Sequence, residues 1–169
     1  MAPLVRRTWA PCGKTPILYQ RTRSHEKISM IAALTVPPKR RRVGLYFSLH
    51  SSNVTAKLVT RFLRNLSRQV QRPLVVVWDR YRPHRAISTQ KFLSRNKKIH
   101  IYFLPPYAPE LNPVELFWSY LKNNPLANYP AYDINTLGAT TRYHASKIRR
   151  RPSLLRSFLY GTPLFLCPK

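Results

Sequence analysis

The amino-acid sequence predicts a single α/β domain in which helices flank a mixed β-sheet. Short apolar runs of strand length alternate with segments of helical periodicity, an order typical of α/β proteins. One run, Leu74 to Trp78, contains no polar residue, which predicts a central strand buried on both faces. A strand, a helix and another strand follow one another there, so we expect a parallel pair. With 169 residues, the chain is long enough for one domain with its own core.

The first elements are predicted from apolar runs and their boundaries. Residues 1 to 26 contain several Pro and Gly residues and are expected to be extended and turn-rich. The runs from Ile28 to Val36 and from Val43 to Leu49 are apolar and short, so each predicts a strand. Only a short basic link separates them. The two strands are therefore expected to form a hairpin.

A long amphipathic helix is predicted next. Apolar residues recur at three- and four-residue steps from Val54 to Val70, and Ser52 or Asn53 is expected to cap the helix. The opposite face carries a basic stripe suited to phosphate groups, although an ordinary solvated helix face explains the same residues equally well. The stripe consists of Lys57, Arg61, Arg64 and Arg68.

The second half of the chain continues the alternation. Pro83 to Asn96 predicts a weak helix and Ile99 to Leu104 a strand that ends at two prolines. Asn112 and Pro113 are typical of a helix start, with Asn as the cap and Pro at the first helical position. Further along, residues 136 to 151 are expected to be helical and residues 154 to 160 form an apolar patch.

The charge balance points to a polyanionic partner. The chain has 30 Lys and Arg residues against 5 Asp and Glu residues, a formal net charge of +25. Such one-sided charge opposes compaction, and nucleic acid is the usual partner that relieves it. No apolar run approaches 18 residues and no secretion signal follows Met1, so we expect a cytoplasmic, DNA-associated protein rather than a membrane or secreted one.

Two of the five acidic residues occupy positions where chemistry is expected. Asp79 directly follows the apolar strand, at the carboxyl end where α/β proteins place their sites, and Glu115 opens the helix after the next strand. Structural roles remain open for both, because Asp79 could cap a turn and Glu115 could complete a capping box. Their scarcity favours a metal-binding role, since Mg²⁺ prefers carboxylate oxygens together with water and phosphate oxygens. We expect the two carboxylates to converge at one edge of the sheet.

Three stretches resemble the Tc/mariner-like insertion-sequence transposases of bacteria. They are Trp78 to Arg85 (WDRYRPHR), Phe103 to Lys122 (FLPPYAPELNPVELFWSYLK) and Arg6 to Leu18 (RRTWAPCGKTPIL). The resemblance spans roughly Pro3 to Asn128, and the second stretch is the most specific. The resemblance implies a ribonuclease-H-like fold and metal-dependent cleavage and strand transfer of DNA. It also implies a triad of two aspartates and a glutamate or aspartate that holds two Mg²⁺ (or Mn²⁺) ions.

The resemblance assigns roles residue by residue. Asp79 matches the second acid of the triad and Glu115 the third, with 35 residues between them, so both are expected to be catalytic and metal-binding. His84 matches a histidine that commonly follows the second acid, although a hydrogen-bonded histidine at a helix start explains it better than metal ligation. Arg80 replaces the asparagine often found there. Residues expected to bind nucleic acid are the basic stripe, Arg80, His84 and Arg85.

The largest departure of the sequence from the family pattern is at its amino-terminal end. The first acid of the family ends a strand that precedes the segment matching Arg6 to Leu18, and no Asp or Glu occurs before Glu26. The sequence therefore predicts a catalytic domain over residues 1–128 whose first strand is missing or incomplete, followed by a partly helical tail over 129–169. An inactive or partial transposase is expected, with DNA, a second copy or an upstream fragment of the same transposase as partners. The alternative is a non-enzymatic, basic nucleic-acid-binding protein.

Overall fold

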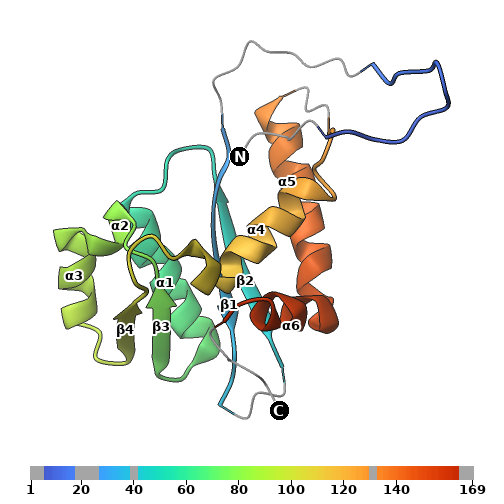
Figure 1. The fold of residues 1–169 in the computed structure, drawn as a ribbon. Coiled ribbons are helices and arrows are strands. Elements are labelled where there is room, and N and C mark those ends of the chain that lie inside the picture. Colours follow the sequence, from blue (N-terminus) through green and yellow to red (C-terminus); the bar gives the residue numbers. More distant parts are fainter. Residues whose placement is uncertain (1–5, 18–26, 39–41, 130–132, 164–169) are drawn as a thin grey trace.

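The computed structural model describes residues 6–17, 27–38, 42–129 and 133–163 (Figure 1). Strands and helices alternate in the first part of the chain, and helices alone follow. In chain order the elements are β1 (Ser29–Thr35), β2 (Gly44–His50), α1 (Ala56–Val70), β3 (Leu74–Trp78), α2 (Arg82–Arg85), α3 (Ile87–Ser94), β4 (Ile99–Phe103), a 3₁₀-helix (Pro109–Leu111), α4 (Pro113–Asn123), α5 (Ile134–Arg149) and α6 (Pro152–Tyr160).

The four strands form two separate pairs rather than one continuous hydrogen-bonded sheet. β1 and β2 are antiparallel, with Ser29 opposite His50 and Thr35 opposite Gly44, as expected for a hairpin. The centre of the link between them, residues 39–41, lies outside the described residues. β3 and β4 are parallel, as their strand–helix–strand order predicts. Both kinds of pairing predicted for a mixed sheet are therefore present.

Helix α1 begins later than the sequence suggests. Ser52 and Asn53 were predicted as caps, but the Thr55 hydroxyl accepts the hydrogen bond from the Leu58 backbone N–H, at 3.4 Å. The earlier cap prediction is therefore wrong. The helix ends at Val70, and Gln71 caps it in the left-handed conformation, with a φ of 55° and a backbone N–H that donates to the Ser67 carbonyl.

Two apolar clusters hold the elements together. One lies between β2 and the helices α4, α5 and α6, and the other between α1, β3 and β4. The helices beyond residue 128 thus share a core with β2 and α4. Buried residues of the first cluster include Leu45, Phe117, Leu121, Ala145 and Leu155, and those of the second include Val59, Leu63, Leu66, Leu74 and Ile99.

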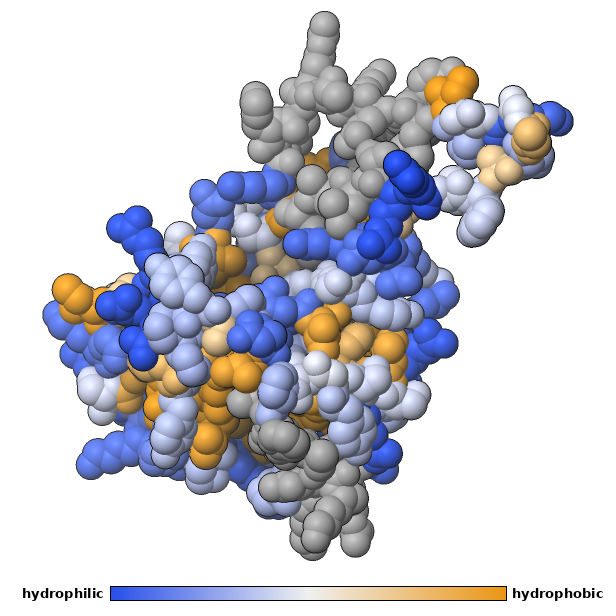
Figure 2. All heavy atoms as spheres, in the orientation of Figure 1, coloured by the Kyte–Doolittle hydropathy of each residue, from blue (hydrophilic) through white to orange (hydrophobic). Residues whose placement is uncertain are grey.

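The expectation that β3 is buried on both faces is wrong. Leu74 and Trp78 are buried, whereas Val75 is 68% and Val77 48% exposed. Successive side chains of a strand point to opposite faces, and α1 covers only one of them. Figure 2 shows apolar residues gathered on the surface over this part of the molecule. One face of the parallel pair is thus open within the described residues.

The remaining helices differ from expectation at their limits. The weak helix predicted over Pro83 to Asn96 is two helices, because Ala86 adopts an extended conformation between α2 and α3. Residues 154 to 160, predicted only as an apolar patch, belong to helix α6. In the described part of the chain, no helix combines the length and the apolar character needed to cross a membrane.

Candidate metal and nucleic-acid site

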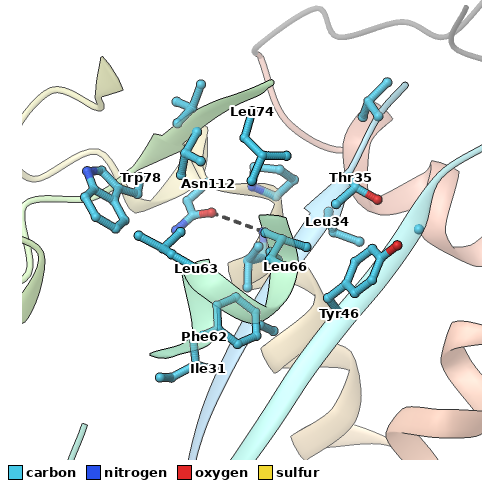
Figure 3. A pocket seen from close by; sticks show the side chains of 18 of the residues that line it. Ile31, Leu34, Thr35, Tyr46, Phe62, Leu63, Leu66, Leu74, Trp78 and Asn112 are labelled. Carbon is cyan, nitrogen blue, oxygen red and sulfur yellow. Dashed lines mark hydrogen bonds between the residues drawn. The ribbon is translucent and has the colours of Figure 1, made fainter. Parts of the chain in front are cut away.

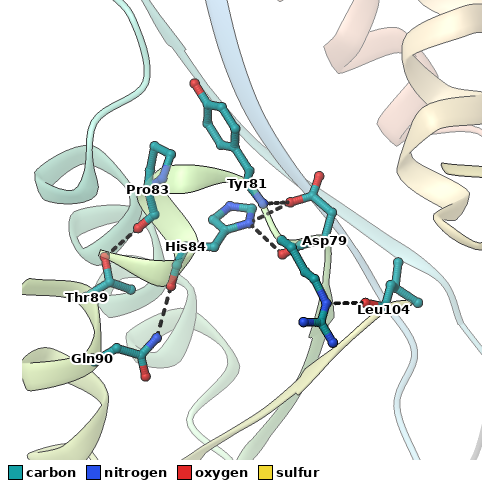
Figure 4. Close-up of polar contacts among 8 residues, drawn as sticks. Asp79, Tyr81, Pro83, His84, Thr89, Gln90 and Leu104 are labelled. Atoms are coloured by element: carbon teal, nitrogen blue, oxygen red, sulfur yellow. Dashed lines mark hydrogen bonds and ion pairs between the residues drawn. The ribbon is translucent and has the colours of Figure 1, made fainter. Parts of the chain in front are cut away.

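Asp79 is the first residue after strand β3, and its carboxylate is held by two hydrogen bonds. Its Oδ1 atom accepts from the Tyr81 backbone N–H at 2.9 Å and from His84 Nδ1 at 2.8 Å (Figure 4). The hydrogen bond from His84, helped by that from Tyr81, lowers the pKa of Asp79, although partial burial opposes this shift. Asp79 is therefore an anion near neutral pH, with a fixed orientation.

His84 is fixed on both sides by its neighbours. Its Nδ1 atom also lies 3.2 Å from the Asp79 backbone carbonyl oxygen; both neighbours are acceptors, which assigns the ring proton to Nδ1. The imidazole ring stacks on Trp78, with centroids 4.3 Å apart and planes 5° apart, and meets the Tyr81 ring edge-on. The structure thus places His84 as a partner of Asp79. Sequence reasoning missed Trp78 and Tyr81, whose roles follow from ring contacts that no spacing reveals.

Glu115 lies in the first turn of helix α4. Asn112 caps this helix as predicted, since its side-chain oxygen accepts from the Val114 backbone N–H at 3.2 Å. The Glu115 carboxyl group itself makes no hydrogen bond to any described residue, so the capping-box role is not supported. Partial burial and the negative charge of Asp79 raise the pKa of Glu115, against a smaller opposing effect of Lys122.

Asp79 and Glu115 converge on one pocket of about 200 Å³. The loop from Leu104 to Pro109 forms its other wall. Two hydrogen bonds tie this loop to the end of β3: the Leu104 N–H donates to the Trp78 carbonyl at 2.8 Å, and Arg80 Nε donates to the Leu104 carbonyl at 3.2 Å. The predicted meeting of the two carboxyl groups at the ends of β3 and β4 is therefore present.

The chemistry of this pair suits a hard divalent cation. Asp79 is anionic and its charge disfavours ionisation of Glu115, so a cation between them would relieve the repulsion. Mg²⁺ commonly uses one or two carboxylates and completes its shell with water and phosphate oxygens. Within the described residues, no group of three or more His, Cys, Asp or Glu side chains is placed to hold a metal. The described residues therefore fit a partial site rather than a complete triad.

The predicted nucleic-acid-binding cations are exposed. All four residues of the basic stripe lie on the solvent side of α1, and Arg80, next to Asp79, and Arg85, the last residue of α2, are exposed. Among the described residues the one ion pair joins Asp79 and His84, so no carboxylate there neutralises the stripe. Arg64 packs over the Phe92 ring at 5.4 Å and Arg80 over the Phe103 ring at 6.0 Å. These contacts orient two guanidinium groups without removing their charge.

Comparisons with known proteins concern the family and the fold of the chain. The family model described as DDE superfamily endonuclease matches residues 2–138. A search of curated proteins found no match. Similar solved structures include the Mos1 transposase paired-end complex with left transposon end (14% identity, TM-score 0.64, 95% of this chain and 47% of that one). The Mos1 strand transfer complex has 17% identity and a TM-score of 0.55 over 96% and 51% of the two chains.

A third similar structure is the Mos1 mariner paired-end complex with Mn. Its identity is 17% and its TM-score 0.55, over 98% of this chain and 53% of that one. The chain thus spans about half the length of the transposase chains that it matches. At these identities the likeness establishes the fold, which is the predicted ribonuclease-H-like α/β class.

Proposed function

The chain belongs to the DDE superfamily endonucleases, and from this premise we propose that it binds DNA and holds a divalent metal ion between Asp79 and Glu115. The observation that carries the proposal is the convergence of the two carboxyl groups on one pocket, where partial burial and the charge of Asp79 raise the pKa of Glu115. In this function Asp79 and Glu115 bind the metal, and His84 keeps Asp79 oriented and ionised.

The reaction class follows from the family and the donor set. When bound, divalent ions activate an attacking hydroxyl group and stabilise the leaving oxygen in phosphodiester cleavage, which is the chemistry of DNA transposition. Glu115 must lose its proton to bind a cation. Because its pKa is raised, metal affinity should increase with pH over the range in which Glu115 ionises.

Binding of Mn²⁺ to the purified 169-residue chain, followed by electron paramagnetic resonance, tests the metal site. Asp79→Asn and Glu115→Gln should each abolish most of the binding, since each removes a carboxylate ligand. Glu110→Gln is the matched control, because Glu110 is an exposed carboxylate in the preceding 3₁₀-helix that does not line the pocket. Equal loss in all three variants would show unspecific charge binding instead.

Activity of the 169-residue chain is a separate question. We expect it to cut and join DNA very slowly or not at all with Mg²⁺, because two carboxylates among the described residues leave a two-ion site short of a ligand. A plasmid-nicking assay with Asp79→Asn as the control measures this. Cleavage that depends on Asp79 would contradict the expectation.

A non-enzymatic DNA-binding role is the second candidate, favoured by the net charge of +25 and by the exposed basic stripe. Chelation separates the two functions. A simple binder holds DNA equally well with chelator, whereas a metal site that contacts phosphate oxygens loses affinity. A homodimer on DNA and an upstream fragment of the same transposase stay predictions, as do cytoplasmic location and the division of the chain at residue 128.

A further inference from the structure

The loop that follows β4 contains a tyrosine in an unusual backbone conformation. Tyr107 has a φ of 57°, in the left-handed region, which bulky residues rarely adopt. It follows Pro106 in a turn. A proline followed by a residue with positive φ is the pattern of a type II turn, which favours Gly or Asn at the position that Tyr107 occupies. The geometry of the turn therefore does not explain a tyrosine there.

Packing does not explain this tyrosine either. The Tyr107 side chain is fully exposed, whereas an aromatic ring ordinarily stabilises a fold by burying its surface. Within the described residues, no hydrogen bond or ring contact involves it. By contrast, the exposed Tyr143 of α5 contacts Lys147, whose Nζ atom lies 4.6 Å from the ring centroid. A strained backbone without stabilising contacts indicates a role for Tyr107 outside the fold.

Prolines hold the ring of Tyr107 in a fixed place. One proline precedes Tyr107 directly, another stands before that one, and Pro109 follows two residues later. Each proline restricts its own φ to about −65°. The loop is also tied to the end of β3, because Arg80 Nε donates to the Leu104 carbonyl. A ring on such a rigid loop loses little conformational entropy when it contacts a ligand.

The position of Tyr107 defines the kind of ligand. It lines the pocket on which the carboxyl groups of Asp79 and Glu115 converge. Arg80 lines the same pocket, and no carboxylate of the described residues pairs with its guanidinium group. Proteins that bind single-stranded nucleic acid combine such groups, because cations contact the phosphates while exposed aromatic rings stack on the bases. The rim of the pocket therefore fits a DNA strand.

The larger cavity beside the carboxyl pair is less suited to DNA. It encloses about 1200 Å³ and also reaches Asp79 and Glu115. Its walls are mostly apolar and include Leu63, Leu66 and Leu74 (Figure 3). A phosphate group loses its hydration at a high cost in apolar surroundings. A DNA strand that reaches the carboxyl pair is therefore expected along the smaller pocket, past Tyr107.

We propose that the Tyr107 ring stacks on an unpaired base of DNA and so determines which phosphodiester group lies at Asp79 and Glu115. Neighbouring bases cover both faces of a base inside a duplex, so the ring requires a base with a free face, as in single-stranded DNA. Every base has such a face, and the contact is therefore tolerant of sequence. The inference rests on the proposed function, because it adds a base contact to the DNA-binding site.

Binding of single-stranded DNA to the intact 169-residue chain tests the contact. The probes are a labelled oligothymidine of about six nucleotides and an abasic strand of the same length, both with chelator present. Tyr107→Ala should bind the oligothymidine about tenfold more weakly than the parent and the abasic strand equally well, since ring and base form the contact together. Equal loss of affinity for both strands would overturn the proposal.

The salt dependence distinguishes stacking from charge. Because the ring neutralises no phosphate group, Tyr107→Ala should leave the slope of log affinity against log salt unchanged. Thermal unfolding of the variant should match that of the parent, since the exposed side chain makes no stabilising contact. A clear fall in the unfolding temperature would mean that the ring supports the fold, and the proposal would be wrong.

Two matched variants test the ring and its location. Tyr107→Phe keeps the ring and should bind both strands as the parent does. Tyr143→Ala removes an exposed tyrosine of α5 that does not line the pocket, and it should leave the preference for the base-containing strand unchanged. Equal loss of that preference in Tyr107→Ala and Tyr143→Ala contradicts the proposal.

Photo-cross-linking identifies the residue that contacts the base. An oligothymidine with one iodinated uracil is irradiated on the parent chain, and mass spectrometry should find the cross-link on Tyr107. Cross-links on other aromatic residues alone overturn the proposal. If the parent binds neither strand, the proposed DNA-binding function itself fails. If the parent binds both strands and Tyr107→Ala changes neither affinity, the base contact alone is wrong.

Discussion

At the scale of single residues, His84 acts on the carboxylate of Asp79. Its Nδ1–H group donates to Asp79 Oδ1, and stacking on Trp78 keeps the ring in place. The two carboxyl groups of the site therefore differ in acidity, since the pKa of Asp79 is lowered while that of Glu115 is raised. At pH values between these two pKa values, the pair holds one negative charge and one proton that a cation can displace.

Replacing His84 by Phe tests this positioning role. Phe keeps an aromatic ring against Trp78 but lacks the N–H donor, so the pKa of Asp79 should rise toward its ordinary value near 4. A lowered pKa stabilises the fold above that ordinary value. The stability that the variant loses is therefore present above about pH 4 and vanishes as the pH falls through the folded-state pKa. Carboxyl ¹³C chemical shifts measure the titration.

Tyr81→Phe is the control, because Tyr81 donates to Asp79 through its backbone N–H, which the substitution preserves. Its Asp79 titration should match that of the parent. A titration in His84→Phe that equals the parent's would show that the hydrogen bond has no such effect.

At the scale of elements, α1 combines a packing face with a charged face. Val59, Leu63 and Leu66 fix the helix against β3, which turns the basic stripe to solvent. Replacing Lys57 and Arg61 together by Gln should weaken DNA binding across all sequences. It should also reduce the slope of log affinity against log salt by about two, roughly one for each phosphate group that the variant no longer neutralises. Fluorescence anisotropy over a salt series provides both quantities.

A double variant on another helix controls for loss of charge alone. Arg142 and Lys147 are exposed on α5, outside the stripe. Their replacement by Gln should change the slope less than replacement of Lys57 and Arg61. An equal reduction would mean that net charge, rather than the stripe, determines affinity.

Helix α6 tests whether the end of the chain is structurally separate. Leu155 is fully buried in the cluster that contains Phe117 and Leu45. Leu155→Ala should therefore lower the free energy of unfolding by about 2–5 kcal/mol. Ser153→Ala, an exposed position of the same helix, should have little effect. If urea unfolding of the core is unchanged by Leu155→Ala, residues 129–169 are a separate tail.

At the scale of the whole molecule, sequence patterns predicted the positions of the helices and strands better than the helix caps and the burial of the strands. The periodicity of α1 and the apolar runs of the strands located them to within a few residues. The cap of α1 was misplaced because Ser52, Asn53 and Thr55 are all good caps, and only the backbone path decides among them. The burial of Val75 and Val77 depends on whether another element covers β3, which a local run of letters does not encode.

The candidate site, too, could be predicted from the sequence only in part. The order of strands placed Asp79 and Glu115 together, because the ends of β3 and β4 meet at one edge of a parallel pair. The hydrogen bond from His84 and the stacking on Trp78 required the folded structure, since each joins residues through contacts rather than spacing.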